Sequence, residues 1–124
     1  MIHVLFVCLG NICRSPMAEA MFRDMVKKEG LENQIIIDSA GTGDWHIGHI
    51  PHQGTRDLLD QKGISYEGMK ARQISSDDFH HFDYIIGMDE SNIENMKKVQ
   101  SGNTVGFVGR LLDLVSNETM KDVP

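Results

Sequence analysis

The chain has 124 residues, of which 40% are hydrophobic and 24% are charged, and its formal net charge is −6 at pH 7. Length and composition are typical of one globular domain with a modest core, and the acidic balance argues against nucleic-acid or membrane-surface partners. We expect no secretory leader, because the apolar run over residues 2–9 is too short for a signal core or a membrane span.

The two cysteines of the chain, Cys8 and Cys13, lie in one short segment. A pair five residues apart is more typical of reactive thiols in a reduced compartment than of a structural disulfide. We therefore expect a cytoplasmic location.

The first two expected elements flank this cysteine segment. Residues 2–7, apolar except for His3, predict a buried strand. A helix is expected to begin at Ser15 and Pro16 and to end at Gly30. The apolar stripe of this helix is expected to consist of Met17, Ala20, Met21, Met25 and Val26.

The middle of the chain predicts a second strand and a second helix. The strand covers residues 35–37 and is closed by residues 38–41, and a loop rich in Gly and His follows over residues 42–51. Residues 52–61 predict a helix that Gly63 stops.

The last third of the chain predicts two further strands around a helix. A short extended piece is expected at residues 70–74, and residues 84–88 predict a third buried strand. Residues 91–99 predict a helix with Ser91 as its N-cap. Residues 104–108 predict the fourth strand.

This alternation of strands and helices predicts an α/β fold in a single domain over residues 1–124. We expect a three-layer, doubly wound sandwich with a central four-stranded parallel sheet and flavodoxin-like topology. Ligands of such sheets bind beyond the carboxyl ends of the strands, where the segment after residues 2–7 must lie.

Residues 8–15 therefore form a tight loop between a strand and a helix, which is the arrangement of an anion site. Loop N–H groups and the positive end of the helix dipole favour a bound phosphate. The residues expected to bind it are Leu9, Gly10, Asn11, Ile12, Cys13, Arg14 and Ser15.

The residue types in this loop predict phosphoryl transfer. Loop amides, a helix N-terminus and a guanidinium lower the pKa of a cysteine, so we expect Cys8 to be a thiolate nucleophile. Arg14 can bind two phosphate oxygens with its planar fork, and the Ser15 hydroxyl can donate to the Cys8 sulfur. Asn11 tolerates the left-handed conformation that helps Gly10 to turn the loop.

The chain resembles the low-molecular-weight protein tyrosine phosphatases of the bacterial type. It matches the signature of that family in full, a Cys followed by five residues and then Arg-Ser, at Cys8, Arg14 and Ser15. Further similarity extends over residues 38–42, Trp45 with residues 47 and 48, and residues 71–74, 82–85 and 88–92.

The resemblance implies roles for the loop. Cys8 would be the nucleophile that forms a phosphocysteine intermediate, which water hydrolyses, and Arg14 the phosphate clamp. Ser15, Asn11 and Ser39 would hold the loop in shape. Cys13 would be the second cysteine, able to trap oxidised Cys8 as a reversible disulfide.

Two residues outside the loop are candidates for the substrate pocket. Trp45 resembles the aromatic wall beside a phosphotyrosine ring, the alternative being an ordinary, partly buried aromatic. Asp89 lies at the catalytic edge of the sheet, and the alternative is that it orders the turn after its strand.

The general acid of the family lies in an Asp-Pro-aromatic-aromatic motif near the C-terminal end. The resemblance places this motif, and a final helix, after Asp122-Val123-Pro124. We therefore expect the acid beyond this sequence, and Asp122 is a weaker candidate for the role.

No metal and no organic cofactor are implied. His46, His49 and His52 are spaced three residues apart, but they lie in a loop interrupted by Gly and Pro, so loop histidines are expected rather than ligands. A zinc site at the two cysteines would lack further thiols.

The expected substrates are tyrosine-phosphorylated proteins or peptides, and phosphate and similar oxyanions should compete with them. Phosphoarginine is an alternative substrate. An arsenate reductase would need further redox cysteines, and a non-catalytic phosphotyrosine binder is the third interpretation. We expect a monomer or weak self-association.

Overall fold

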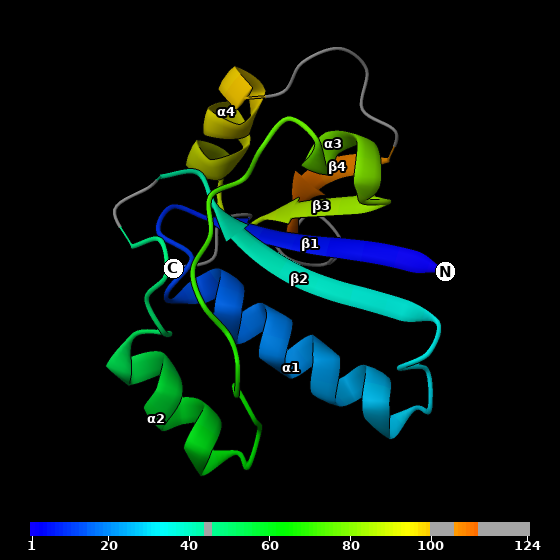
Figure 1. The fold of residues 1–124 in the computed structure, drawn as a ribbon, viewed down its shortest axis with the longest axis vertical. Helices are drawn as coiled ribbons and strands as arrows, with labels where there is room; N and C mark the ends of the chain where they lie inside the picture. The colour runs from blue at the N-terminus through cyan, green and yellow to red at the C-terminus, as the bar shows by residue number, and fades with distance from the viewer. Residues whose placement is uncertain (44–45, 100–105, 112–124) are drawn as a thin grey trace.

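The computed structural model describes residues 1–43, 46–99 and 106–111. In these residues four parallel strands form one sheet in the order β2-β1-β3-β4, with helices on both faces (Figure 1). This architecture confirms the expected α/β fold. The elements are β1 (Ile2–Cys8), α1 (Arg14–Lys28), β2 (Ile35–Gly41), α2 (Gln53–Gln61), α3 (Asp78–His81), β3 (Tyr84–Gly87), α4 (Glu90–Val99) and β4 (Phe107–Arg110).

The strand order places the switch of the topology between β1 and β3. The chain passes from β1 to β2 at one edge and then returns to β3 on the other side of β1. In Figure 1, α1 and α2 lie on one side of the sheet, and α3 and α4 lie on the other. Doubly wound sheets bind ligands at such a switch point, outside the carboxyl ends of the strands. Cys8 ends β1 at this point.

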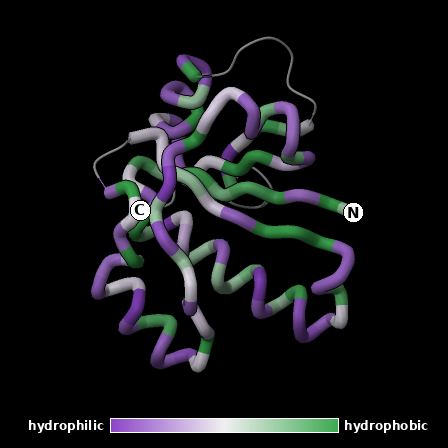
Figure 2. The backbone as a smooth tube through the Cα atoms, viewed as in Figure 1, coloured by the Kyte–Doolittle hydropathy of each residue, from purple (hydrophilic) through white to green (hydrophobic). Residues whose placement is uncertain are grey.

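The core has two halves because the side chains of β1 alternate between the faces of the sheet. Leu5 and Val7, both 0% exposed, pack on the side of α3 and α4, whereas Val4 and Phe6 pack on the side of α1. Figure 2 shows the hydrophobic residues concentrated along the strands. Burial of each large apolar side chain stabilises the fold by roughly 1.5–3 kcal/mol.

The apolar stripe expected for α1 is partly wrong. Ala20 and Val26 are buried, but Met21 is 36% and Met25 is 60% exposed. The stripe that packs toward the sheet contains Ala18, Phe22 and Val26, each four residues from the next. This spacing is itself helical, so the sequence pattern had the right period but a shifted face.

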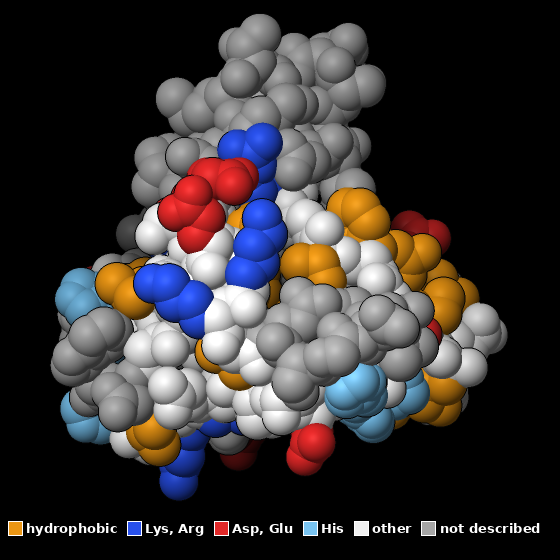
Figure 3. All heavy atoms as spheres, turned by 90° about the horizontal axis from the view of Figure 1, so that it is seen from above, with side chains coloured by type: hydrophobic (Ala, Val, Ile, Leu, Met, Phe, Trp, Pro, Cys, Tyr) orange, Lys and Arg blue, Asp and Glu red, His pale blue; other side chains and the backbone are white. Residues whose placement is uncertain are grey.

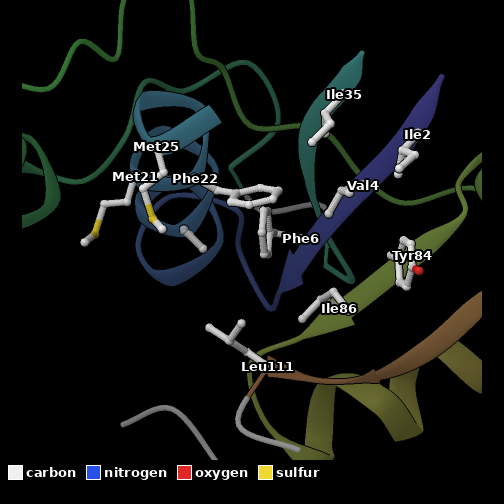
Figure 4. A pocket seen from close by; sticks show the side chains of 11 residues that line it. Ile2, Val4, Phe6, Met21, Phe22, Met25, Ile35, Tyr84, Ile86 and Leu111 are labelled. Atoms are coloured by element: carbon white, nitrogen blue, oxygen red, sulfur yellow. The ribbon is translucent and has the colours of Figure 1, made fainter. Parts of the chain in front are cut away.

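Met21 and Met25 line an apolar hollow of about 510 Å³ between α1 and the sheet. Figure 4 shows Phe22 pointing from α1 toward Phe6 of β1, with Leu111 on the other side of the hollow. The rings of Phe6 and Phe22 meet edge to face, with 5.8 Å between their centroids. Aromatic pairs of this geometry are favourable beyond the area that they bury.

Other element boundaries also differ from the prediction. β2 continues to Gly41, because its polar residues Asp38 and Ser39 still pair with β1. α4 begins at Glu90, so Ser91 lies inside the helix and is not its N-cap. The carboxylate of Asp89 accepts the hydrogen bond from the backbone N–H of Asn92.

Two further elements differ in the last third of the chain. β4 occupies residues 107–110, later than expected, and the expected residues 104 and 105 lie outside the described part of the chain. The sequence reading missed α3, whose four residues are too few to show a helical period.

Charged side chains of both signs are mixed on the surface. On the face seen in Figure 3, acidic and basic side chains lie next to one another. One such pair joins Arg110 to Glu90 at 3.6 Å. None of the described helices is long and apolar enough to cross a membrane.

Candidate active site

The phosphate loop, residues 8–15, is held at both ends by regular structure. Cys8 is the last residue of β1, and Arg14 is the first residue of α1. The backbone carbonyls of Cys8 and Leu9 accept hydrogen bonds from Thr42 and Gly43, at 2.9 and 2.8 Å. The loop therefore also rests on the residues that follow β2.

Two residues allow the tight course of the loop. Asn11 has a φ of 57°, the left-handed conformation that the sequence predicted. A Cβ atom at Gly41 would lie 2.8 Å from the Leu9 carbonyl oxygen, so only glycine permits this approach between β2 and the loop. Gly41 is a supporting residue that the sequence reading did not single out.

The loop surrounds a hollow of about 280 Å³ that is lined by Cys8, Leu9, Gly10, Ile12, Cys13, Arg14 and His46. Of these residues, only His46 was not among the expected catalytic and phosphate-binding residues of the loop. A Cβ atom at Gly10 would lie 2.8 Å from the His46 ring, which shows how closely this ring covers the loop. Asn11 and Ser15 do not line the hollow, and their part in phosphate binding stays a prediction.

The Cys8 side chain faces two hydrogen-bonding groups. Its residue is only 3% exposed, Ser15 Oγ lies 3.0 Å from its Sγ, and the Asn11 backbone N–H donates to Sγ at 3.3 Å. The expected contact between Ser15 and the sulfur is confirmed.

Asn11 is the centre of the network that supports the loop. Its Nδ2 donates to Ser15 Oγ at 2.8 Å and to Ser39 Oγ at 2.9 Å. Its Oδ1 accepts a hydrogen bond from the Arg72 backbone N–H at 3.0 Å. The structure thus brings together Asn11, Ser15 and Ser39, as the sequence analysis expected.

Arg72 connects this network to β2 and α3. Its guanidinium donates to Asp38 and to Asp78, in both cases at 3.1 Å. Burial works against the charge of Arg72, but the two carboxylates outweigh it and raise its pKa further above the ordinary value. The sequence reading did not give Arg72 this role, although residue 72 lies in one of the segments that carried the family resemblance.

Arg14 and Asp89 meet across the topological switch. Arg14 Nη1 donates to Asp89 Oδ2 at 2.7 Å, and the other carboxylate oxygen accepts the Asn92 backbone N–H at 2.8 Å. Asp89 therefore orders the turn after β3 and also contacts Arg14, whereas its part in the substrate pocket stays a prediction.

The contacts of Asp89 also affect its protonation. Burial favours the neutral carboxyl, but the hydrogen bonds from Arg14 and from backbone N–H groups outweigh burial and lower the pKa of Asp89 below its ordinary value. Asp89 is thus an anion that holds Arg14, and it is a poor proton donor.

Cys13 differs from Cys8 in exposure and in contacts. Both thiols are free, but Cys13 is exposed and its carbonyl oxygen accepts a hydrogen bond from Thr55 Oγ1 at 3.3 Å. Partial burial and the negative charge of Cys8 raise the pKa of Cys13, and they outweigh the charge of Arg14. Trp45 and Asp122 lie outside the described residues.

The three histidines of the loop after β2 do not converge. The rings of His46 and His49 are 5.7 Å apart, whereas His52 caps α2 by accepting the Gly54 backbone N–H at its Nδ1, at 3.3 Å. Among the residues that the structure describes, no three His, Cys, Asp or Glu side chains are grouped as metal ligands.

A buried cysteine and an arginine that line one hollow, at the carboxyl edge of a parallel sheet, define a class of protein. The loop, the helix N-terminus and the two side chains are those of the cysteine-dependent phosphatases, in which the sulfur attacks a phosphate bound by the loop.

Comparison with known proteins gives the same result. The family model for the low molecular weight phosphotyrosine protein phosphatases matches residues 3–124. The low molecular weight protein-tyrosine-phosphatase YfkJ of Bacillus subtilis is 55% identical over 124 residues, which are 100% of this chain and 80% of the relative. The crystal structure of YfkJ superposes with a TM-score of 0.96 and covers 100% of this chain and 78% of that one.

Two further relatives show the range of the similarity. The protein-tyrosine-phosphatase PtpA of Staphylococcus epidermidis is 48% identical over 100% of this chain and 77% of its own length. The crystal structure of the Drosophila arginine phosphatase DARP is 39% identical, with a TM-score of 0.80, over 89% of this chain and 71% of that one. The chain belongs to the low molecular weight phosphotyrosine protein phosphatase family, whose members are cysteine-based hydrolases.

Proposed function

We propose that this protein hydrolyses phosphotyrosine monoesters in proteins or peptides, with Cys8 as nucleophile and Arg14 as phosphate clamp. The observation that carries the proposal is the Cys8 sulfur, which is buried in the phosphate loop and contacted by Ser15 and the Asn11 N–H. The similarity to the protein-tyrosine-phosphatases YfkJ and PtpA supports the substrate class.

The reaction runs in two displacements. The Cys8 thiolate attacks phosphorus while the bond from phosphorus to the tyrosine oxygen breaks, which gives phosphocysteine and a phenolate that takes up a proton from a general acid or from water. Water then attacks phosphorus and breaks the S–P bond, so that inorganic phosphate leaves and the thiolate is restored. Arg14 binds two equatorial oxygens in both transition states, and Ser15 donates a hydrogen bond to the sulfur when it leaves.

The intermediate can be detected directly. We expect rapid acid quenching after mixing with an aryl phosphate to give a protein whose mass has increased by one phosphoryl group, located on the peptide that contains Cys8. An acidic leaving group is preferred for this experiment because it departs without a proton from a general acid. A phosphoryl group on another residue, or turnover without any adduct at Cys8 under conditions that trap it, would contradict the mechanism.

Phosphoarginine is the second candidate substrate. The observation in its favour is the similarity to the Drosophila arginine phosphatase. We expect kcat/KM for a phosphotyrosine peptide to exceed that for the same peptide with phosphoarginine at that position. The opposite order would assign the protein to the arginine phosphatases without changing the roles of Cys8 and Arg14.

Asp89 is proposed to orient the phosphate clamp. In Asp89→Asn the charge that holds Arg14 is lost, and we expect kcat/KM for an aryl phosphate to fall roughly three- to tenfold, the size of one charge-assisted hydrogen bond. Glu94→Gln, which removes an exposed acid from the helix α4 that follows Asp89, is the matched control. Equal activity of Asp89→Asn and Glu94→Gln would show that Arg14 needs no such support.

The other expectations complete the proposal. We propose a cytoplasmic protein in which Cys13 forms the reversible disulfide with oxidised Cys8; the exposure of Cys13 supports access by oxidants and reductants. Inorganic phosphate and oxyanions of the same shape should compete with substrate for the phosphate loop.

A further inference from the structure

A buried glutamate lies behind the phosphate loop and outside the expected site. Glu19, in the second turn of α1, is 4% exposed, and a carboxylate is rarely buried without a compensating partner. The Ser39 hydroxyl donates to Glu19 Oε1 at 2.6 Å, and Arg23 forms an ion pair with Oε2. Both carboxylate oxygens therefore act as acceptors.

The hydrogen bonds between Glu19 and Cys8 have only one consistent direction. The Arg72 backbone N–H donates to Asn11 Oδ1 and so fixes the orientation of the amide. Both N–H groups of the Asn11 amide must then donate, one to Ser39 and one to Ser15. Ser39 accepts from Asn11, so its own hydrogen goes to Glu19.

The same reasoning applies on the other side of Asn11. Ser15 Oγ accepts from the amide, so the Ser15 hydrogen is directed to Cys8 Sγ, 3.0 Å away. A chain of three side chains thus connects a buried negative charge in α1 to the nucleophile. An ionised carboxylate can only accept, so Glu19 forces the direction of the Ser39 hydroxyl beside it.

We propose that Glu19 is a positioning residue for the phosphatase reaction: it accepts the hydrogen of Ser39 and so keeps the Ser39 oxygen available to accept from Asn11, and together with the Arg72 N–H this holds the amide that directs Ser15 to Cys8. The inference rests on the proposed function, because it concerns the same nucleophile. Glu19 touches neither the hollow nor Cys8, and it acts through Ser39, Asn11 and Ser15.

A carboxylate is required because two donors approach Glu19 from two sides. Ser39 approaches from β2, and Arg23 from the next turn of α1; Arg23 also donates to the Ile37 carbonyl oxygen at 3.0 Å. A glutamine at position 19 has one acceptor oxygen for these two donors. When that oxygen faces Arg23, its NH₂ group faces Ser39 and reverses the Ser39 hydroxyl.

The geometry makes the effect of Glu19 dependent on pH. Burial raises the pKa of Glu19 and outweighs the hydrogen bond from Ser39 and the charge of Arg23. The other charged groups that act on Glu19 are Asp38, which opposes its ionisation, and Arg72, which favours it. As pH falls through the raised pKa, Glu19 gains a proton and the direction of the network is lost.

The test compares the wild type with Glu19→Gln from acid to neutral pH, using an aryl phosphate with an acidic leaving group. We expect kcat/KM to fall roughly three- to tenfold in Glu19→Gln at neutral pH, the size of one oriented hydrogen bond. The ratio of wild type to variant should approach one at acid pH, where the wild type also has a neutral side chain at position 19.

A double variant separates orientation from packing. When Glu19→Gln is combined with Arg23→Gln, the Arg23 guanidinium no longer competes for the amide oxygen introduced at position 19, so this oxygen can again accept from Ser39. We expect this double variant to be more active than Glu19→Gln alone, after correction for the effect of Arg23→Gln by itself. Asp24→Asn, which removes an acid paired with Lys28 on the same helix, is the control and should change nothing.

A second readout does not depend on turnover. In a Cys13→Ser background Cys8 is the only thiol, and its alkylation by iodoacetate reports the thiolate form. At a fixed neutral pH, Glu19→Gln should lower the rate of this alkylation. The proposal is overturned if the activity ratio is constant with pH, the double variant shows no recovery and the alkylation rate is unchanged. Absence of phosphocysteine in the wild type would instead refute the proposed function.

Discussion

Replacement of Cys8 with serine is expected to lower the turnover of a phosphotyrosine peptide by at least roughly 10⁴-fold, which corresponds to about 5.4 kcal/mol of transition-state stabilisation. A serine hydroxyl stays protonated near neutral pH, and the Cys8 sulfur contacts the Ser15 hydroxyl and the Asn11 N–H, neither of which is a base. The measurement is phosphate release without added metal and under reducing conditions.

The Cys13→Ser variant is the matched control for this experiment. Cys13 lies in the same loop but is exposed and has a raised pKa, so its replacement should leave most of the activity intact. If Cys8→Ser retained the activity of the wild type, Cys8 would not be the nucleophile. If the wild type bound the peptide without turnover, the protein would act as a phosphotyrosine binder.

The centre of the site could be predicted because its parts are neighbours in sequence. Three adjacent segments of the sequence form it: an apolar strand, the loop that contains Cys8 and Arg14, and a helix that begins beside Pro16. Local patterns fix each of them, and the parallel sheet then places the loop at its carboxyl edge. The structure confirms this order, with Cys8 at the end of β1 and Arg14 at the start of α1.

The contacts that support the loop could be identified only from the folded structure. Asn11 and Ser39 are 28 residues apart, and Arg14 and Asp89 are 75 residues apart, so no local period relates them. Resemblance to the family identified Ser39, but nothing in the sequence gave the partner of Asp89. Glu19 was also missed, because a single acid in a charged amphipathic helix predicts a solvated side chain and here it is buried against Ser39.

The predicted end of a strand was wrong where polar residues of the strand belong to the site. Asp38 and Ser39 interrupt the apolar pattern of the second strand, so the sequence predicted its end at Ile37. Both residues continue the pairing with β1, and their side chains contact Arg72 and Asn11. The part of a strand that carries functional groups therefore lacks the hydrophobic pattern by which strands are detected.

Replacement of Arg14 with lysine is expected to lower kcat for an aryl phosphate by roughly 10²–10³-fold, although the positive charge is retained. Lysine is a point charge without the planar fork, so it cannot hold two phosphate oxygens in the fixed geometry that the transition state requires. The loss should appear mainly in kcat, because charge attraction still brings the dianion into the hollow. Steady-state kinetics with one aryl phosphate at fixed pH measures both parameters.

The Asp89→Asn variant tests in addition whether Asp89 acts through Arg14. Asp89 contacts the Arg14 guanidinium at 2.7 Å, so its effect on activity should pass through that side chain. In the Arg14→Lys background, Asp89→Asn should then have a smaller effect than in the wild type, which is the coupling that a double-mutant cycle measures. Independent, multiplicative effects would show that Asp89 acts on the reaction by another route, and a lysine variant with wild-type kcat would remove Arg14 from the phosphate clamp.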